Sequence, residues 1–198
     1  MCTSWKCFKL YVHKCVYKPA EDSVLALEAL RELRERGLEY ERIVDVGTGS
    51  GILALAAYEL FKPSLLAAID ISPYAVQTAK LNLPEEAHIA QCNGLKCLNT
   101  HWDLAILNPP YLPLEPSERG DPCTKWLQIS WSGGGGVMRS LTLETLKASN
   151  EVLLVHSTLS PVTLEELEAV ASVEVLGAEK FFFEEIKALR LKRRTTRG

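Results

Sequence analysis

The sequence lacks the features that mark several protein classes. It has no run of 18 or more apolar residues, so it predicts no membrane-spanning helix. Its six cysteines form no C-x-x-C pair and its four histidines lie apart, so no metal site is expected. The start of the chain lacks a signal-peptide pattern, and we expect a cytoplasmic protein. The formal charge of −3 gives no general reason to expect a nucleic-acid binder.

The composition is that of an ordinary globular domain. With 198 residues, 47% hydrophobic and 24% charged, the chain can bury one sizeable core. We expect a single domain over residues 1–198, with an N-terminal extension over 1–21 and a basic tail over 192–198. The cysteines are interpreted as small buried hydrophobic residues in a reducing compartment, and disulfides stay open as an alternative.

Short apolar runs alternate with helical patterns along the chain, which predicts an α/β fold with a mostly parallel sheet. Residues 1–18 are expected to form a short hairpin or strand. A first helix is expected from a cap at Asp22 or Ser23 to a stop at Gly37, and a last helix from a cap at Ser160. Strands are predicted over 43–46, 65–69, 88–91, 102–107 and 152–155, with a terminal antiparallel pair over 173–176 and 186–191, and further helices over 52–60, 73–83 and 137–148.

A glycine-rich turn follows the strand predicted over 43–46 and opens a helix. Its sequence is Gly47-Thr48-Gly49-Ser50-Gly51. Glycines let the backbone approach a ligand closely, and a helix N-terminus favours negative charge. The G-x-G-x-G spacing is neither the dinucleotide fingerprint nor a Walker A loop. The turn therefore predicts a nucleotide-type ligand of another kind.

Two polar residues end the next strands. Asp70 lies about 20 residues after the glycine turn, where an acid commonly accepts hydrogen bonds from ribose hydroxyls. An N-cap with Pro73 in the following first helical turn is the alternative, and both roles can hold. Asn93 follows the strand over 88–91 and could meet the edge of a base, although a turn-forming Asn-Gly pair explains it equally well.

The stretch Asn108-Pro109-Pro110-Tyr111 ends the strand predicted over 102–107. In open α/β sheets, ligands lie beyond the carboxyl ends of the strands. The carboxamide of Asn108 can accept and donate hydrogen bonds, Pro109 leaves a free carbonyl, and Tyr111 offers a face for stacking. This slot suits a planar nitrogen whose lone pair must be aimed at an electrophile, whereas the plain alternative is a strand followed by a proline turn. Residues 112–136 are expected to form a lid or binding loop.

The order of these features resembles the class I S-adenosylmethionine-dependent methyltransferases, and Asn-Pro-Pro-Tyr is similar to the motif of enzymes that methylate amino or amide nitrogens. Residues 17–23 (Tyr-Lys-Pro-Ala-Glu-Asp-Ser) and the segment from Trp131 to Met138 resemble HemK-like glutamine methyltransferases of the archaeal and eukaryotic branch. The resemblance covers roughly residues 16–192. It implies a seven-stranded, mostly parallel Rossmann-like sheet with helices on both faces and an antiparallel C-terminal hairpin.

The resemblance also implies the site. Catalysis would depend on Asn108, Pro109 and Tyr111, and S-adenosylmethionine would be the cofactor. Residues expected at that cofactor are Ser23, Asp45, Gly47, Gly49, Gly51, Asp70, Ile71, Asn93 and Asn108. The chain departs from the family at Lys18, where Glu is usual, and at Ser23, where Thr is usual. Asn93 or Gly94 replaces the acid near the adenine, which leaves that contact open.

The implied function is methylation of a glutamine amide in a class I release factor, a protein of translation termination. That branch works with a small zinc-containing activator that adds a strand to its partner's sheet. We expect such an activator on the edge strand near Ile89, unless residues 1–16 cover that edge. One alternative is an adenine or cytosine amino-methyltransferase of DNA or RNA, which the net charge disfavours. A catalytically silent methyltransferase-fold scaffold is the other, and an NAD-dependent oxidoreductase is weaker because the glycine spacing is wrong.

Overall fold

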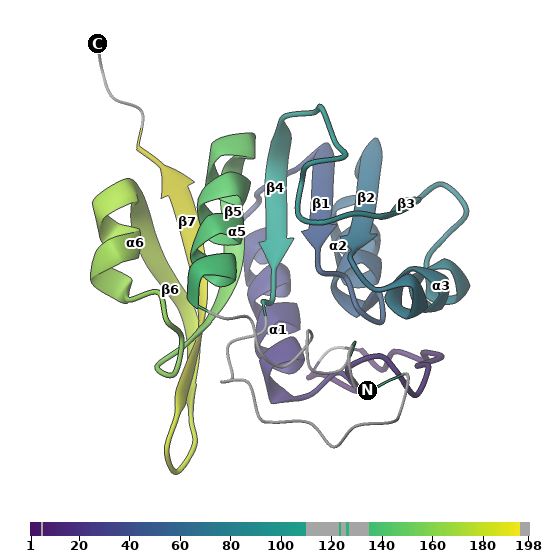
Figure 1. The fold of residues 1–198 in the computed structure, drawn as a ribbon, viewed down its shortest axis with the longest axis horizontal. Coiled ribbons are helices and arrows are strands. Elements are labelled where there is room, and N and C mark those ends of the chain that lie inside the picture. The colour runs from purple at the N-terminus through teal and green to yellow at the C-terminus, as the bar shows by residue number, and fades with distance from the viewer. Residues whose placement is uncertain (5, 110–122, 124–125, 127–134, 195–198) are drawn as a thin grey trace.

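The computed structural model describes residues 1–4, 6–109, 123, 126 and 135–194 (Figure 1). Its centre is a seven-stranded sheet with the order β3-β2-β1-β4-β5-β7-β6. The first five strands are parallel, and β7 runs antiparallel between β5 and β6. The strands are β1 (Arg42–Val46), β2 (Leu65–Asp70), β3 (His88–Gln91), β4 (Trp102–Leu107), β5 (Ser149–Ser157), β6 (Ala171–Lys180) and β7 (Glu185–Arg193). The predicted fold class, with its antiparallel C-terminal hairpin, is confirmed.

Helices cover both faces of the sheet because its central strands are apolar on both sides. Successive side chains of a strand point to opposite faces. Ile43 therefore packs in one apolar cluster with α1 (Glu21–Glu35), α2 (Ile52–Phe61) and α3 (Pro73–Asn82). Its neighbour Val44 packs in a second cluster on the opposite face, which α5 (Gly135–Ala148) and α6 (Leu164–Val170) cover.

The strand register brings three predicted site segments together. Val46 at the end of β1 pairs with Ile69 of β2 on one side and with Leu107 of β4 on the other. The residues that follow these three positions are Gly47, Asp70 and Asn108. Because parallel strands end at the same edge of a sheet, the glycine turn, the acid and the carboxamide become neighbours.

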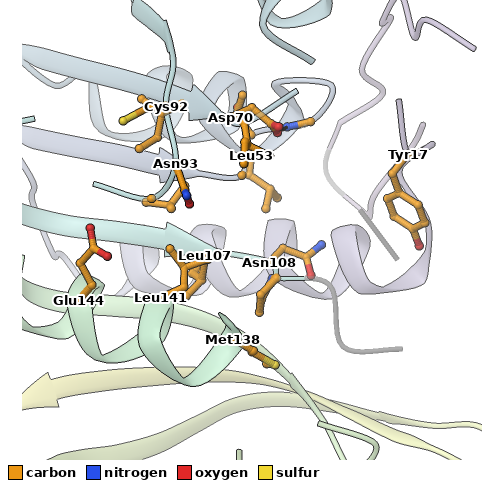
Figure 2. Close-up of a pocket in the computed structure, with 18 of the residues that line it drawn as sticks. Tyr17, Leu53, Asp70, Cys92, Asn93, Leu107, Asn108, Met138, Leu141 and Glu144 are labelled. Atoms are coloured by element: carbon orange, nitrogen blue, oxygen red, sulfur yellow. Dashed lines mark hydrogen bonds between the residues drawn. The ribbon is translucent and has the colours of Figure 1, made fainter. Parts of the chain in front are cut away.

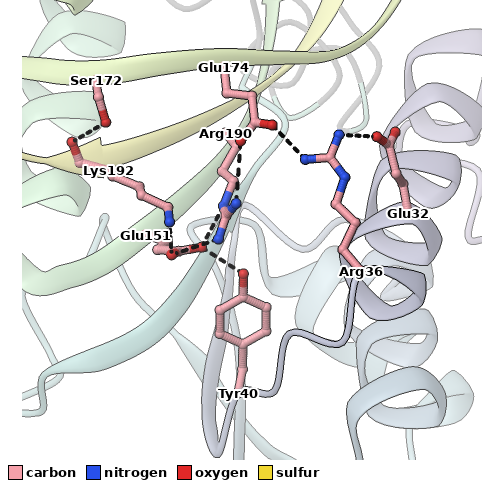
Figure 3. Close-up of polar contacts among 8 residues, drawn as sticks. All are labelled: Glu32, Arg36, Tyr40, Glu151, Ser172, Glu174, Arg190 and Lys192. Carbon is pink, nitrogen blue, oxygen red and sulfur yellow. Dashed lines mark hydrogen bonds and ion pairs between the residues drawn. The ribbon is translucent and has the colours of Figure 1, made fainter.

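A network of charged side chains anchors the C-terminal hairpin to the sheet and to the end of α1 (Figure 3). Arg190 of β7 is largely buried and contacts Glu151 of β5 through two nitrogens, at 2.8 and 2.9 Å. The same carboxylate accepts a hydrogen bond from Tyr40 at 2.6 Å. Glu174 of β6 joins Arg190 (3.3 Å) to Arg36 (2.5 Å). A paired, hydrogen-bonded charge of this kind tolerates burial that an isolated one does not.

Two predicted helix caps are wrong. The N-cap of α1 is Ala20, which makes no side-chain capping bond, and Asp22 and Ser23 lie inside the first turn. The N-cap of α6 is Thr163, which lies three residues after the expected Ser160. Thr163 prevails because Glu166, three residues later, completes a capping box. Ser160 instead accepts a hydrogen bond from the Val162 backbone N–H.

The N-terminal segment also differs from the expected hairpin or strand. Among the described residues of this segment, strand pairing is limited to an isolated bridge between Cys2 and Cys7. Its polar contacts connect to the helices on one face: Ser4 to Glu28 of α1, Lys6 to Glu59 of α2, and Tyr11 to Asn82 of α3. Within the described residues, no backbone hydrogen bond joins this segment to β3. The described part of this segment therefore does not extend the sheet at β3.

All six cysteines are paired in disulfides, so their interpretation as free, buried hydrophobic residues is wrong and the disulfide alternative holds. Cys92–Cys97 closes the loop that follows β3, and Cys15–Cys123 joins the segment before α1 to the region after β4. Both bonds therefore connect chain segments close to the carboxyl edge of the sheet. The third disulfide is Cys2–Cys7.

Candidate active site

A cavity of about 560 Å³ opens at the carboxyl ends of β1, β2 and β4 (Figure 2). This volume lies in the usual range for small-molecule and cofactor sites. The predicted residues that line it are Ser23, Gly47, Gly49, Asp70, Ile71, Asn93, Asn108 and Pro109. Asp45 and Gly51 do not line the cavity and lie behind its wall, and Tyr111 falls outside the described residues.

The glycine turn contributes space to the cavity. Gly47 and Gly49 have φ angles of +76° and +54°, which side chains rarely adopt, and a Cβ atom at either position would meet no atom within 4 Å. The N–H groups of Gly47 and Gly49 are already used, by the Ile69 carbonyl and the Asp70 carboxylate respectively. A ligand can therefore lie directly against this backbone.

Asp45 supports the glycine turn from behind. Its Oδ2 accepts hydrogen bonds from the Thr48 hydroxyl at 2.6 Å and from the Ala54 N–H at 3.1 Å. The side chain is 1% exposed. Burial raises the pKa of Asp45 to about 7, although the bonds from Thr48 and Ala54 act in the opposite direction. Asp45 thus holds the turn to the first residues of α2 and makes no contact with the cavity.

This buried acid predicts an unusual dependence of stability on pH. Because its pKa is higher in the folded than in the unfolded chain, its contribution is fully present below about pH 4 and is lost as pH rises to about 7. Asp45→Asn keeps one oxygen for both hydrogen bonds and cannot ionise. We expect the variant to become progressively more stable than wild type between pH 4 and pH 8. The difference in unfolding free energy should grow by roughly a few kcal/mol, and the difference in melting temperature should grow with it.

Thermal unfolding of both proteins across that pH range measures the effect. Glu86→Gln removes an exposed carboxylate and is the matched control, which should show no such trend. A difference between Asp45→Asn and wild type that stays constant with pH, or shrinks as pH rises, would contradict the assignment.

Asp70 joins the glycine turn to the loop after β2. Its Oδ2 accepts from Gly49 N–H at 2.9 Å and its Oδ1 from Ser72 N–H at 2.8 Å. Burial raises the pKa of Asp70, against the effect of these bonds. The side chain of Ser72 caps α3, so the capping alternative for Asp70 is wrong. A carboxylate offers about four lone-pair positions, which leaves Asp70 able to accept from ligand hydroxyls as well.

One end of the cavity suits a flat heterocycle. Ile71 lines it with an apolar side chain that is 38% exposed, and Asn93 lines it with a carboxamide. Glu144 of α5 also lies at this end, where its Oε1 accepts from the Leu95 N–H at 2.9 Å (Figure 2). No sequence pattern indicates Glu144 as a site residue, because it lies 49 residues beyond its Leu95 partner, on another helix. The open space over Gly47 and Gly49, the Asp70 carboxylate and the end lined by Ile71 and Asn93 together fit S-adenosylmethionine.

The other end of the cavity contains Asn108 and Pro109, together with Tyr17 and Met138 (Figure 2). Asn108 Nδ2 donates a hydrogen bond of 2.9 Å to Asp22 of α1, a contact that neither the predicted cap nor the resemblance of residues 17–23 indicates. Burial, and then the Asp22 charge, raises the pKa of Tyr17. Tyr17 therefore stays a neutral phenol at this end of the site.

Comparisons with known proteins relate the chain to methyltransferases. Residues 21–104 match the profile of the family described as Ribosomal protein L11 methyltransferase (PrmA). The chain is 28% identical, over 193 residues, to a provisionally named protein N5-glutamine methyltransferase of Methanocaldococcus jannaschii, covering 91% of this chain and 93% of that protein. It is 30% identical to a tRNA1(Val) (adenine(37)-N6)-methyltransferase of a Flavobacteriaceae bacterium, covering 64% of this chain but only 55% of that relative.

Among solved structures, the fold is similar to that of the E. cuniculi Mtq2–Trm112 complex, which is responsible for methylation of the eRF1 termination factor. The TM-score is 0.66 with 19% identity, over 91% of this chain and 99% of the matched one. At this identity the likeness concerns the fold. Within the described residues, no helix is long and apolar enough to cross a membrane.

Proposed function

We propose that this chain, a class I S-adenosylmethionine-dependent methyltransferase, transfers a methyl group to the side-chain amide nitrogen of a glutamine in a translation release factor. One observation carries the proposal. The Oδ1 atom of Asn108 is buried and has no hydrogen-bond partner within the described residues. Leaving a buried acceptor unpaired costs roughly 1–3 kcal/mol, which suits a group that is completed by a ligand.

The proposed chemistry uses two acceptors from neighbouring residues of the cavity lining, Asn108 and Pro109. S-adenosylmethionine supplies a methyl group that its sulfonium makes electrophilic. An amide nitrogen is a poor nucleophile because its lone pair is delocalised into the carbonyl. Asn108 Oδ1 and the Pro109 carbonyl would accept both hydrogens of the amide NH2 and aim its lone pair. Such positioning can contribute roughly 7–11 kcal/mol. No strong base is needed, because the nitrogen becomes acidic once it is alkylated.

The rim of the cavity supports a protein acceptor. The β6–β7 hairpin projects beyond the carboxyl edge of the sheet (Figure 1), and its tip carries Phe182 and Phe183, which are 92% and 85% exposed. Glu184 follows this tip, and after burial and the charges of Asp22 and Glu21 its charge also raises the pKa of Tyr17 in the cavity. Exposed apolar side chains are typical of protein-binding surfaces, and neighbouring carboxylates would repel the phosphates of a nucleic acid. This tip therefore favours a protein acceptor.

Removing this tip should weaken recognition of the whole acceptor protein. We expect the double variant Phe182→Ser, Phe183→Ser to raise KM for the release factor about tenfold and to leave KM for a short glutamine peptide unchanged, because the peptide reaches only the cavity. Val170→Ser, which alters an exposed apolar residue at the end of α6, is the control. Equal KM values for the double variant and wild type on the whole protein would remove this role.

The acceptor class itself is tested by transfer of a labelled methyl group. Purified chain is incubated with labelled S-adenosylmethionine and, separately, with a class I release factor, tRNA and DNA. Incorporation into the release factor supports the proposal. The second candidate, a tRNA adenine methyltransferase, is favoured by the Flavobacteriaceae relative and would label tRNA instead. No incorporation into any acceptor, together with no cofactor binding, would favour the silent scaffold.

We also propose that a small zinc-containing activator of the Trm112 kind docks on β3 by strand addition. β3 is the outer strand of the sheet and pairs only with β2 within the described residues. Cys92 donates its N–H to the Asp70 carbonyl toward β2. Because backbone groups alternate in direction along a strand, the N–H of Ile89 points away from β2, toward a partner.

Proline at this position separates strand addition from simple packing. Ile89→Pro removes an outward N–H while leaving the β2 pairing intact, which an edge strand tolerates. We expect it to abolish co-elution with a Trm112-like activator in size-exclusion chromatography, whereas Ile89→Ala, which keeps the N–H, should still co-elute. A stable complex with Ile89→Pro, or full activity of wild type without any partner, would count against this docking mode.

A further inference from the structure

Asp22 occupies a buried position next to the proposed acceptor slot without lining the cavity. It is the second residue of α1, and its side chain is 5% exposed. Its Oδ2 accepts from Asn108 Nδ2 at 2.9 Å. Its Oδ1 accepts from Ser23 N–H at 2.6 Å and from the Ser23 hydroxyl at 3.2 Å. Every one of these contacts has Asp22 as the acceptor.

This arrangement determines which way the Asn108 carboxamide faces. The two ends of a carboxamide have almost the same shape but opposite hydrogen-bonding character. An ionised carboxylate can only accept, so the NH2 group of Asn108 must face Asp22. Its Oδ1 must then face the other way, and this is the atom that has no partner within the described residues. If the carboxamide were turned around, the Asn108 NH2 group would face the NH2 group of the acceptor glutamine. Both groups are donors, so no hydrogen bond could form between them.

We propose that Asp22 is a positioning residue that fixes the Asn108 carboxamide with its oxygen toward the acceptor nitrogen. The inference rests on the proposed function and adds to it the residue that selects an NH2 donor. A carboxylate is required there because donors converge on both of its oxygens, Ser23 N–H and hydroxyl on Oδ1 and Asn108 Nδ2 on Oδ2. An asparagine at position 22 has a single oxygen and cannot serve both.

The isosteric variant Asp22→Asn tests this assignment while preserving size. Its oxygen can stay on Ser23, and its NH2 then faces residue 108 and turns that carboxamide around. We expect kcat for release-factor methylation to fall at least about tenfold, with the dissociation constant of S-adenosylmethionine changed less than about twofold. Glu21→Gln removes the neighbouring exposed charge in the same helical turn and is the matched control, with kcat unchanged.

A double-mutant cycle distinguishes positioning from a merely structural role. If Asp22 acts through Asn108, adding Asp22→Asn to Asn108→Ala should cause no further loss of kcat. Losses that multiply in the double variant would overturn the inference, as would an Asp22→Asn enzyme with wild-type kcat.

A readout without any substrate keeps the inference separate from the proposed function. The side-chain NH2 signal of Asn108 in ¹H–¹⁵N spectra is assigned by its loss in Asn108→Ala. We expect slow hydrogen exchange of this NH2 group in wild type and in Glu21→Gln, and faster exchange in Asp22→Asn. Unchanged exchange in Asp22→Asn would overturn the positioning role whatever the acceptor proves to be. If the signal responds as expected but no protein is methylated, the proposed function fails and the orientation of Asn108 by Asp22 stands.

Discussion

Replacing Asn108 by alanine is expected to lower kcat for methyl transfer about 100-fold or more while cofactor affinity falls far less. Asn108 supplies one of the two acceptors that would hold the substrate NH2 group, and small misplacements of a reacting group cost about this much in rate. The change also leaves the buried Asp22 carboxylate without its Asn108 partner, so some loss of stability should accompany it.

Steady-state kinetics, calorimetry with S-adenosylmethionine and thermal unfolding separate these effects. Asn99→Ala removes an exposed carboxamide outside the cavity lining and is the matched control. If Asn108→Ala retains more than about a tenth of wild-type kcat, orientation by this group is worth less than about 1.4 kcal/mol. The role assigned to Asn108 would then be wrong.

Replacing Asp70 by alanine is expected to weaken binding of S-adenosylmethionine by about 10- to 100-fold. A hydrogen bond to a charged group is worth roughly 1.5–3 kcal/mol, and this carboxylate is proposed to accept from the ribose hydroxyls. The structure adds a second cause, because the Gly49 N–H loses its acceptor and the glycine turn loses a support. The two causes act in the same direction.

Isothermal titration calorimetry measures the change. Asp103→Ala is the matched control, since Asp103 also accepts from backbone N–H groups, at Glu41 and Arg42, but lies outside the cavity lining. It should leave the dissociation constant unaltered. The same dissociation constant in Asp70→Ala as in wild type would remove Asp70 from the cofactor site.

The parts of the site that sequence reasoning located are those that follow strands directly. Gly47, Asp70 and Asn108 each come after an apolar run, and the register of three parallel strands then makes them neighbours. Hydrophobic patterning determines such strands locally, so their ends can be read from the chain. The position of β3 at the sheet edge was implied by the family resemblance, and the strand order confirms it.

The parts that were missed depend on contacts between distant segments. Asp22 looks like a helix cap in the sequence, but its acceptor role comes from Asn108, 86 residues away. Glu144 reaches the cavity from α5 only because that helix packs over the loop after β3. The start of α6 was missed for a local reason: Ser160 and Thr163 both have capping side chains, and only Thr163 has a glutamate three residues later.

Mass spectrometry of a class I release factor, incubated with this chain, the proposed activator and S-adenosylmethionine, tests the acceptor assignment most directly. We expect one added methyl group on a glutamine side chain, absent when Asn108→Ala replaces wild type. A methyl group found instead on tRNA or DNA under the same conditions, with the glutamines of the release factor unmodified, would contradict the assignment.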